Sequence, residues 1–184
     1  MLVLHFDINR TITIIRDHDV KTGLFDSFKN VLIKYPHARI VLRTYCNDFH
    51  LVKDYFHDYN FVYLLTVWED NMPNYYNTDS EKVMLNNEIK KLHGKTIIVI
   101  KEDADVWIRN YRNNNYGKII YPLKNAIQMS FDDNDCFYSI DDQALVFKIT
   151  TKDAFMNKNY YTNAIKKHYE DDEPFNCLNT CTFL

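Results

Sequence analysis

Short apolar runs alternate with amphipathic segments along most of this chain, and the alternation restricts the fold more than any other feature. The runs are rich in β-branched residues, as strands buried on both faces are; they cover residues 2–8, 39–44, 61–67, 96–100, 127–131 and 145–149. Apolar residues recur at helical spacing between them, in residues 24–35, 51–56, 80–93, 103–111 and 155–169. This order predicts an α/β fold, a Rossmann-like three-layer sandwich with a mainly parallel sheet.

The length and composition fit one domain. A chain of 184 residues, 46% of them hydrophobic, can bury a sizeable core. No stretch resembles a linker, so we expect a single domain over residues 1–184. Its acidic tail, from about residue 171, should be mobile.

Charge and cysteine content exclude several classes of partner. The net charge is -3 and no block of Lys and Arg exists, so we expect no nucleic-acid partner. No apolar run approaches the length of about 18 residues that a membrane span needs. The 4 cysteines lack the paired spacing of a zinc site. These features predict a reduced, cytoplasmic protein.

Polar residues follow three of the predicted strands at the point where each ends. Asp7 and Asn9 follow the first strand, Thr44 closes the second, and Asp132-Asp133 closes the strand that begins at residue 127. The carboxyl ends of parallel strands share one edge of a sheet, where ligands of open α/β sheets bind. Clustered carboxylates repel one another unless a cation lies among them. Oxygen ligands favour Mg²⁺, which commonly binds phosphate as well.

Four segments together resemble the motifs of the haloacid dehalogenase-like superfamily, and in particular a short, little-characterised branch of it. They are Phe6-Asp7-Ile8-Asn9, Arg43-Thr44-Tyr45, Gly117-Lys118 and Phe131-Asp132-Asp133-Asn134. The resemblance covers most of the chain, from Leu2 to about Asp133. It implies Mg²⁺-dependent phosphoryl transfer in which Asp7 attacks phosphorus and forms an aspartyl-phosphate.

The resemblance also implies the ligands of the metal. Asp7, the main-chain oxygen of Asn9, and Asp132 would hold Mg²⁺, and Asp133 would support it directly or through water. All of these donors are oxygen atoms, as Mg²⁺ prefers.

Phosphate contacts follow from the same resemblance. Thr44, with the adjacent Tyr45, would bind phosphate oxygens. A lysine would neutralise the phosphate and orient Asp7. Lys118 is the first choice because it follows Gly117 as in the resembling branch, and Lys124, nearer to Asp132 in the sequence, is the alternative.

Asn9 departs from the pattern of the superfamily. Its phosphatases usually carry an aspartate there, which protonates the leaving group and later activates water. An asparagine amide cannot exchange a proton, and general acid–base catalysis contributes roughly 10²–10⁴ in rate. A slow phosphatase, a phosphotransferase, and a weak or inactive phosphate- or protein-binding module therefore all stay open.

Loop lengths bear on the substrate. Only a short loop separates Thr11 from the helix that begins near Leu24, and residues 67–96 leave room for one helix. By analogy with the superfamily, we expect no large cap domain. An open site of this kind suits a bulky phosphorylated substrate such as a phosphoprotein.

Other candidate sites have simpler explanations. His50, Asp54 and His57 share a helical face at a spacing that a metal could use, although a solvated face accounts for it better. Asp141-Asp142 could replace Asp132-Asp133, but no apolar run leads into this pair.

Two cysteines are further candidates. Cys46 lies near Thr44 without an evident base, so a packed thiol explains it better. Cys181 begins a C-terminal pattern that resembles a lipidation signal, but acidic residues precede it where basic ones would assist membrane binding.

Overall fold

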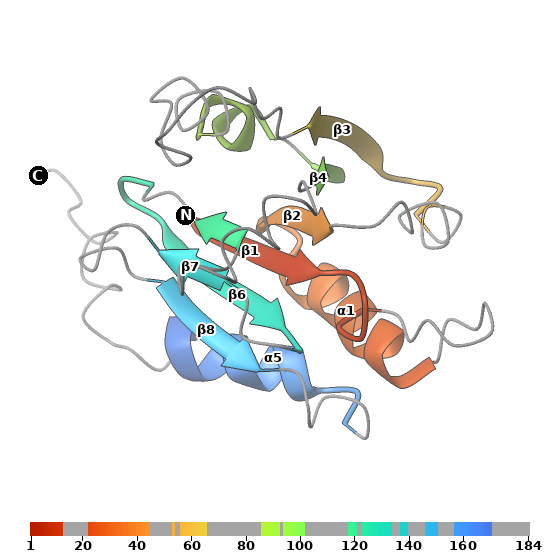
Figure 1. Cartoon of the computed structure of the whole chain (residues 1–184). Helices are drawn as coiled ribbons and strands as arrows, with labels where there is room; N and C mark the ends of the chain where they lie inside the picture. The colour runs from red at the N-terminus through yellow and green to blue at the C-terminus, as the bar shows by residue number, and fades with distance from the viewer. Residues whose placement is uncertain are drawn as a thin grey trace, which may run out of the picture.

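A parallel β-sheet forms the centre of the molecule (Figure 1). The computed structural model describes residues 1–12, 22–44, 53, 56–65, 86–92, 94–101, 118–120, 123–133, 137–139, 146–150 and 157–170. The sheet has six strands in the order β3-β4-β2-β1-β6-β8, and every neighbouring pair is parallel. Its strands are β1 (Leu2–Asp7), β2 (Arg39–Thr44), β3 (Asn60–Leu65), β4 (Thr96–Lys101), β6 (Ile127–Asp132) and β8 (Val146–Thr150).

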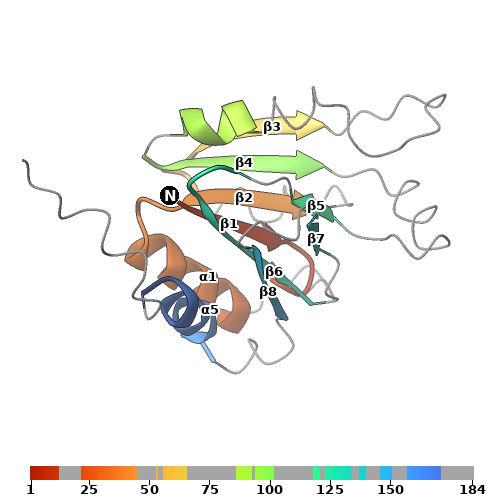
Figure 2. The same cartoon turned by 90° about the vertical axis from the view of Figure 1, so that its left-hand side faces the viewer.

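Helices cover both faces of the sheet. α1 (Thr22–Lys34) and α5 (Tyr160–Ile165), which continues into a π-helical turn, η2 (Lys166–Glu170), lie side by side on one face (Figures 1 and 2). On the other face, Ile89 of a helical segment over residues 86–91 packs against Val3, Val41 and Ile98. The predicted α/β fold with a parallel sheet is therefore confirmed.

Alternation along the strands divides the core between the two faces. Leu4, Phe6, Leu42 and Phe131 contribute to the cluster under α1 and α5, while the intervening residues face the other side. Phe6 stacks on Phe131 with ring centroids 4.5 Å apart, and Phe28 of α1 meets Phe6 edge-on. These aromatic contacts support the register of β1 and β6 one residue before Asp7 and Asp132, which end the two strands.

α1 and α5 differ in how well their bounds follow the sequence pattern. α1 agrees with the predicted helix to within two residues, and Pro36 follows its end. The last helix was predicted from residue 155, but α5 begins at Tyr160. The main-chain N–H of Asn159 instead donates to Asn157 Oδ1 at 3.0 Å, a local bond that competes with helical hydrogen bonding.

Two short strands were not predicted. β5 (Lys118–Ile120) and β7 (Phe137–Ser139) form a separate parallel pair. Figure 2 draws this pair at the side toward which the arrows of the main sheet point. Short strands of this length carry too little periodicity to be recognised from sequence.

Several predictions fall outside the described residues. They are the helix at 103–111, most of the helix at 51–56, and the acidic tail from residue 171. Residues 13–21 and 66–85, which decide whether a cap is present, are outside them too. The absence of a cap therefore stays a prediction.

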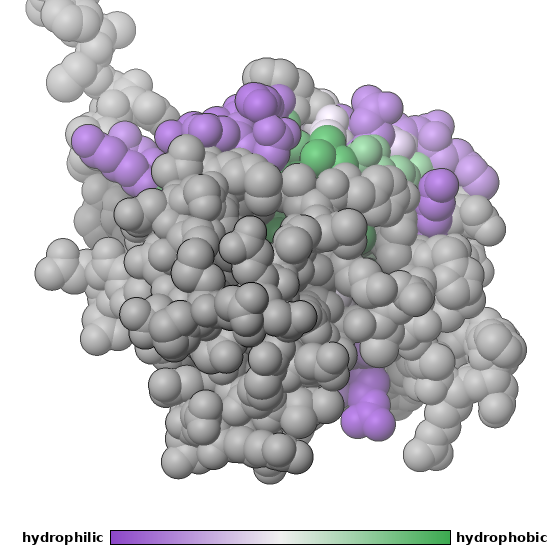
Figure 3. Space-filling view, turned by 45° about the horizontal axis from the view of Figure 1, so that its top comes forward, coloured by the Kyte–Doolittle hydropathy of each residue, from purple (hydrophilic) through white to green (hydrophobic). Residues whose placement is uncertain are grey.

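The described surface carries few large apolar side chains. In the part of the chain that the structure describes, these are Met1, Ile33 and Tyr169. Figure 3 shows mostly hydrophilic described residues around a small hydrophobic area on one side of the molecule. None of the described helices is long and apolar enough to cross a membrane.

Candidate metal centre

The topology brings Asp7 and Asp132 to the same edge of the sheet. β1 lies between β2 and β6, and Phe6 is in register with Phe131, so the aspartates that follow them end adjacent strands at one level. The chain places β2 on one side of β1 and β6 on the other. Such a reversal of strand order opens the crevice in which α/β proteins bind ligands.

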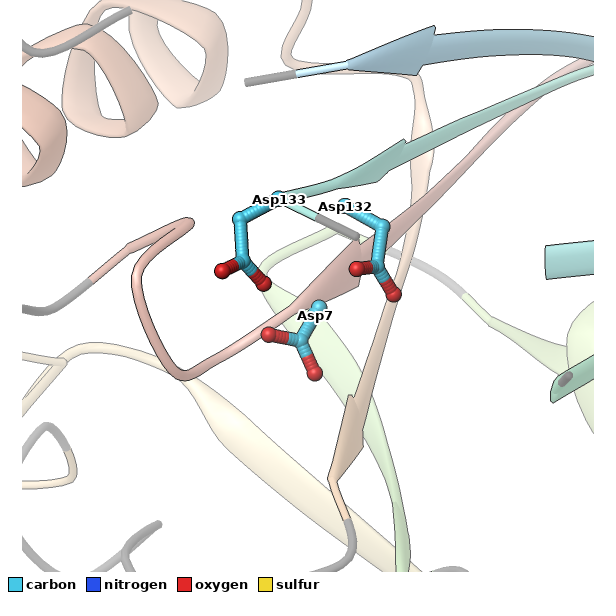
Figure 4. Close-up of side chains that lie close together, drawn as sticks. All are labelled: Asp7, Asp132 and Asp133. Atoms are coloured by element: carbon cyan, nitrogen blue, oxygen red, sulfur yellow. The ribbon is translucent and has the colours of Figure 1, made fainter. Parts of the chain in front are cut away.

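Three carboxylates converge at this edge. One oxygen atom each of Asp7, Asp132 and Asp133 lies within 4.8 Å of the others, and Figure 4 shows the three side chains gathered beside the ends of their strands. Asp7 is 7% exposed and Asp132 is 3% exposed. Carboxylates are seldom buried at this depth without a counter-charge, because removing a carboxylate from water is costly. The cluster could therefore hold a metal ion, as the sequence predicts.

The donor set restricts the kind of ion. All three groups are carboxylates, and hard divalent cations such as Mg²⁺ and Ca²⁺ prefer oxygen ligands. Zinc in structural sites is usually held by sulfur and imidazole instead. The cluster fits a hard cation, and it does not by itself distinguish Mg²⁺ from Ca²⁺.

The turn after β1 carries Asn9 and Arg10 past the cluster. Buried Ile8 and Ile12 hold the turn from below, and the N–H of Ile12 donates to the main-chain oxygen of Ile8 at 2.9 Å. Arg10 has a positive φ of 62°, which is uncommon outside glycine. The side-chain oxygen of Asn9 is buried. These contacts give the turn a defined position above the end of β1.

Arg10 reaches the acidic cluster from solvent. Its Nη1 lies 3.7 Å from Oδ2 of Asp133, whose side chain is 13% exposed. The side chain of Arg10 is itself 71% exposed, so this ion pair contributes little to stability. Its position at the open side of the cluster is nevertheless one from which a substrate could be contacted.

Arg43 is a second arginine at the cluster, and it has no role in the predicted site. It is in register with Asp7, and partners in neighbouring parallel strands place their side chains on the same face. Arg43 is 2% exposed, which is rare for arginine. A buried guanidinium therefore belongs to the same face and level of the sheet as Asp7.

His5 and Gln128 lie deeper on this face. His5 Nε2 donates to Gln128 Oε1 at 3.0 Å, and both side chains are buried. Burial, and then the charge of Arg43, lower the pKa of His5 to about 3, although the hydrogen bond that His5 donates to Gln128 opposes the shift. His5 is therefore neutral at physiological pH.

A periodic signal in the sequence could have revealed this polar layer. Polar residues occupy alternate positions at 5 and 7 in β1, at 43 in β2, and at 128, 130 and 132 in β6. In strands that are otherwise apolar, such alternation marks one face of the sheet as polar. Of the residues on this polar face, the predicted site includes only Asp7 and Asp132, which end their strands.

Thr44 and Tyr45 follow Arg43. Thr44 is the last residue of β2 and is buried, in register with Lys101 of β4. Alternation places its side chain on the face opposite to that of Arg43 and Asp7. Tyr45 lies outside the described residues.

The two candidate lysines lie in different parts of the fold. Lys118 begins β5. Lys124 is exposed in the turn that precedes β6, whereas Asp132 ends that strand. β6 has six residues, and at roughly 3.3 Å per residue its first and last Cα atoms are about 17 Å apart. Lys124 therefore lies near the amino-terminal end of β6, whereas Asp132 lies at its carboxyl-terminal end.

The weaker candidates are mostly untested by the structure. His57 is exposed. The others lie outside the described residues: His50, Asp54, Cys46, Asp141, Asp142 and Cys181.

Comparisons with protein-family models, with curated proteins and with solved structures find no match for this chain. The fold and the acidic cluster are thus established from the chain's own residues.

Proposed function

We propose that this protein is a Mg²⁺-dependent phosphohydrolase or phosphotransferase of the haloacid dehalogenase-like kind. The observation that carries the proposal is the convergence of Asp7, Asp132 and Asp133 at the carboxyl ends of adjacent parallel strands. The resemblance of the sequence motifs implies roles for the same three residues, and this supports the proposal. We further propose a bulky phosphorylated substrate, such as a phosphoprotein, in the cytoplasm.

Asp7 is the nucleophile in this proposal. A carboxylate oxygen of Asp7 attacks the phosphorus atom, the bond between phosphorus and the leaving oxygen breaks, and the phosphoryl group is left on Asp7 as an acyl phosphate. Bound Mg²⁺, held by Asp7, Asp132 and the main-chain oxygen of Asn9, would supply positive charge to the phosphoryl oxygens. Asp133 would support the ion, and the exposed Arg10 lies 3.7 Å from Asp133.

The second half of the reaction regenerates Asp7. The oxygen of a water molecule, or of an acceptor's hydroxyl group, attacks the phosphorus atom, the bond between phosphorus and the Asp7 oxygen breaks, and phosphate or the phosphorylated acceptor leaves while the proton passes to solvent. Neither half has a general acid or base at residue 9, because Asn9 cannot exchange a proton. We therefore propose slow turnover, fastest for esters whose leaving groups need no protonation.

The phosphate contacts remain those implied by the resemblance. Because the Thr44 side chain lies on the face opposite to Asp7, main-chain N–H groups that follow Thr44, with Tyr45, would bind the phosphate oxygens, and Lys118 would approach from β5. Lys118 is favoured over Lys124 because the latter is exposed at the other edge of the sheet.

A binding module is the second candidate, and Asn9 is the observation that favours it. A protein that only binds phosphate needs neither a nucleophile nor a general acid. The buried position of Asp7 beside two further carboxylates favours the enzyme, since a carboxylate repels phosphate unless it holds a metal or reacts.

Hydrolysis of an aryl phosphate with and without Mg²⁺ tests the proposal. Wild type should show Mg²⁺-dependent release of the phenol, and Asp7→Asn should abolish it. Asp26→Asn, an exposed residue of α1, is the matched control and should retain the wild-type rate. Equal rates for Asp7→Asn and wild type would exclude Asp7 as the nucleophile.

A further inference from the structure

We propose that Arg43 is the residue that binds and positions the phosphoryl group beside Asp7. This inference rests on the phosphoryl site proposed above, and it gives Arg43 the part that the motif resemblance assigns to a lysine. The juxtaposition that carries it is the register of β1 and β2, which places a buried guanidinium level with Asp7 on the same face of the sheet.

The charged neighbours of Arg43 across the sheet lie on one side of it, toward the cluster. On β1 its partner in register is Asp7, and on β4 its partner is Ile100, which is buried and apolar. Asp132 ends the strand on the far side of β1. On this face a row thus runs from Ile100 through Arg43 and Asp7 to Asp132, and its charged part is at the metal centre.

The charge balance of the centre explains why an anion would bind only after a cation. Asp7, Asp132 and Asp133 together outweigh Arg10 and Arg43 by one negative charge when all are ionised. A divalent cation reverses the balance to one net positive charge. The centre would then attract an oxyanion, for which a guanidinium offers two parallel N–H donors.

Burial makes Arg43 better suited to this part than Lys124, which is exposed. A guanidinium that is 2% exposed is held by its surroundings, so its donors are arranged before the substrate arrives. Arg10 is too exposed to be held in the same way, and its place at the open side suits contact with the remainder of the substrate.

Binding of inorganic phosphate to the full chain, measured by calorimetry with and without Mg²⁺, tests the inference. Wild type should bind phosphate in the presence of Mg²⁺ and much more weakly in its absence. Arg43→Met should weaken that binding about 10–100-fold, as the loss of hydrogen bonds from a charged group does. Arg43→Lys should lie between the two, because it keeps the charge and loses the fork.

Arg39→Lys is the matched control. Arg39 is the first residue of β2, at the end of the strand away from Asp7, and it donates to the main-chain oxygen of His37. The Arg39→Lys variant should therefore bind phosphate as wild type does. Mg²⁺ binding without phosphate gives a second reading. Arg43→Met should bind Mg²⁺ at least as tightly as wild type, since it removes a positive charge that opposes the ion.

Two results would overturn the inference. The first is that the Arg43→Lys and Arg43→Met variants both bind phosphate as tightly as wild type. Arg43 would then be only a structural counter-ion to the aspartates. The other is absence of phosphate binding to wild type at saturating Mg²⁺. If Arg43→Met does not fold, Arg43→Lys alone decides, because its affinity must fall.

Failure of the proposed enzyme activity is distinguishable from failure of this inference. Phosphate binding that depends on Mg²⁺ and Arg43 in a protein with no Asp7-dependent hydrolysis would support the role of Arg43 and reject the enzyme. Hydrolysis that depends on Asp7 with unchanged KM in Arg43→Lys would support the enzyme and reject the role of Arg43.

Discussion

The phenol of Tyr161 in α5 donates a hydrogen bond to the main-chain oxygen of Thr11, and both residues are buried. This bond joins a helix near the end of the described chain to the turn that carries Asn9 and Arg10. The ring of Tyr161 also packs edge-on against Phe6 and Phe131. α5 therefore supports the turn that carries Asn9 and Arg10, and it does so from the face of the sheet that α1 and α5 cover.

Replacing Tyr161 with Phe should destabilise the protein by about 1–3 kcal/mol, because it leaves a buried carbonyl oxygen without its donor. The turn after β1 should loosen as well, and Mg²⁺ affinity should fall with it. Urea unfolding and a Mg²⁺ titration measure the two effects. Tyr35→Phe, which removes a longer bond of 3.4 Å to Thr162, should cost less. Equal losses in both variants would deny the bond to Thr11 its special role.

Mg²⁺ should raise the melting temperature of wild type by ligand linkage. At a concentration roughly 100 times Kd the gain is about 2.7 kcal/mol, which corresponds to about 5–10 °C for a protein of this size. Asp132→Asn should remove most of the rise, because it removes a ligand of the cluster. Asp26→Asn on the surface of α1 should keep it. An undiminished rise in Asp132→Asn would place the ion elsewhere.

Stability should fall as the pH is lowered below about 6.5, because His5 binds a proton in the unfolded chain well before it does so in the folded one. Its folded pKa is about 3 and its ordinary value is 6.5. Between these values the loss from this one group reaches about 1.4 kcal/mol per pH unit. His5→Gln should flatten the dependence, since its amide can still donate to Gln128 but does not titrate.

Urea unfolding from pH 4 to pH 7 measures this effect. His57→Gln serves as the control, because it removes an exposed histidine and leaves the buried layer intact. A slope in His5→Gln as steep as in wild type would assign the acid sensitivity to other groups.

The sheet could be predicted because each strand carries its own local signal. Leu2–Asp7 is largely apolar and Ile127–Asp132 alternates apolar with polar residues; both end in aspartate, and parallel topology then brings the two ends together. Asp7, Asp132 and Asp133 were predicted as one cluster on this basis, and the structure brings them within reach of one ion.

The level of Arg43 relative to Asp7 could not be predicted from local pattern, because it depends on the register of two strands. Which residue of β2 lies level with Asp7 is decided by the pairing of two strands separated by α1, and a shift of one residue would have brought Thr44 to that face instead. The start of α5 was missed for another reason. The side-chain oxygen of Asn157 accepts a hydrogen bond from the main-chain N–H of Asn159, and this bond competes with helix formation.

Asn9→Asp should increase turnover if the remainder of the centre is competent. The new carboxyl group can protonate a poor leaving group and later activate water, so the gain could reach about 10²-fold on an alkyl phosphate. An aryl phosphate should gain less, and the rate should acquire a pH dependence set by the new group. An unchanged or lower rate on the alkyl phosphate would favour the binding module.

A structure with Mg²⁺ and beryllofluoride would show whether Asp7 is a phosphoryl-accepting carboxylate at a metal centre. Beryllofluoride mimics a phosphoryl group bonded to a carboxylate. We expect beryllium bonded to a carboxylate oxygen of Asp7, with Mg²⁺ held by Asp7 and Asp132 beside it. Beryllofluoride bound at another residue, or binding to Asp7 that does not require Mg²⁺, would exclude this role of Asp7.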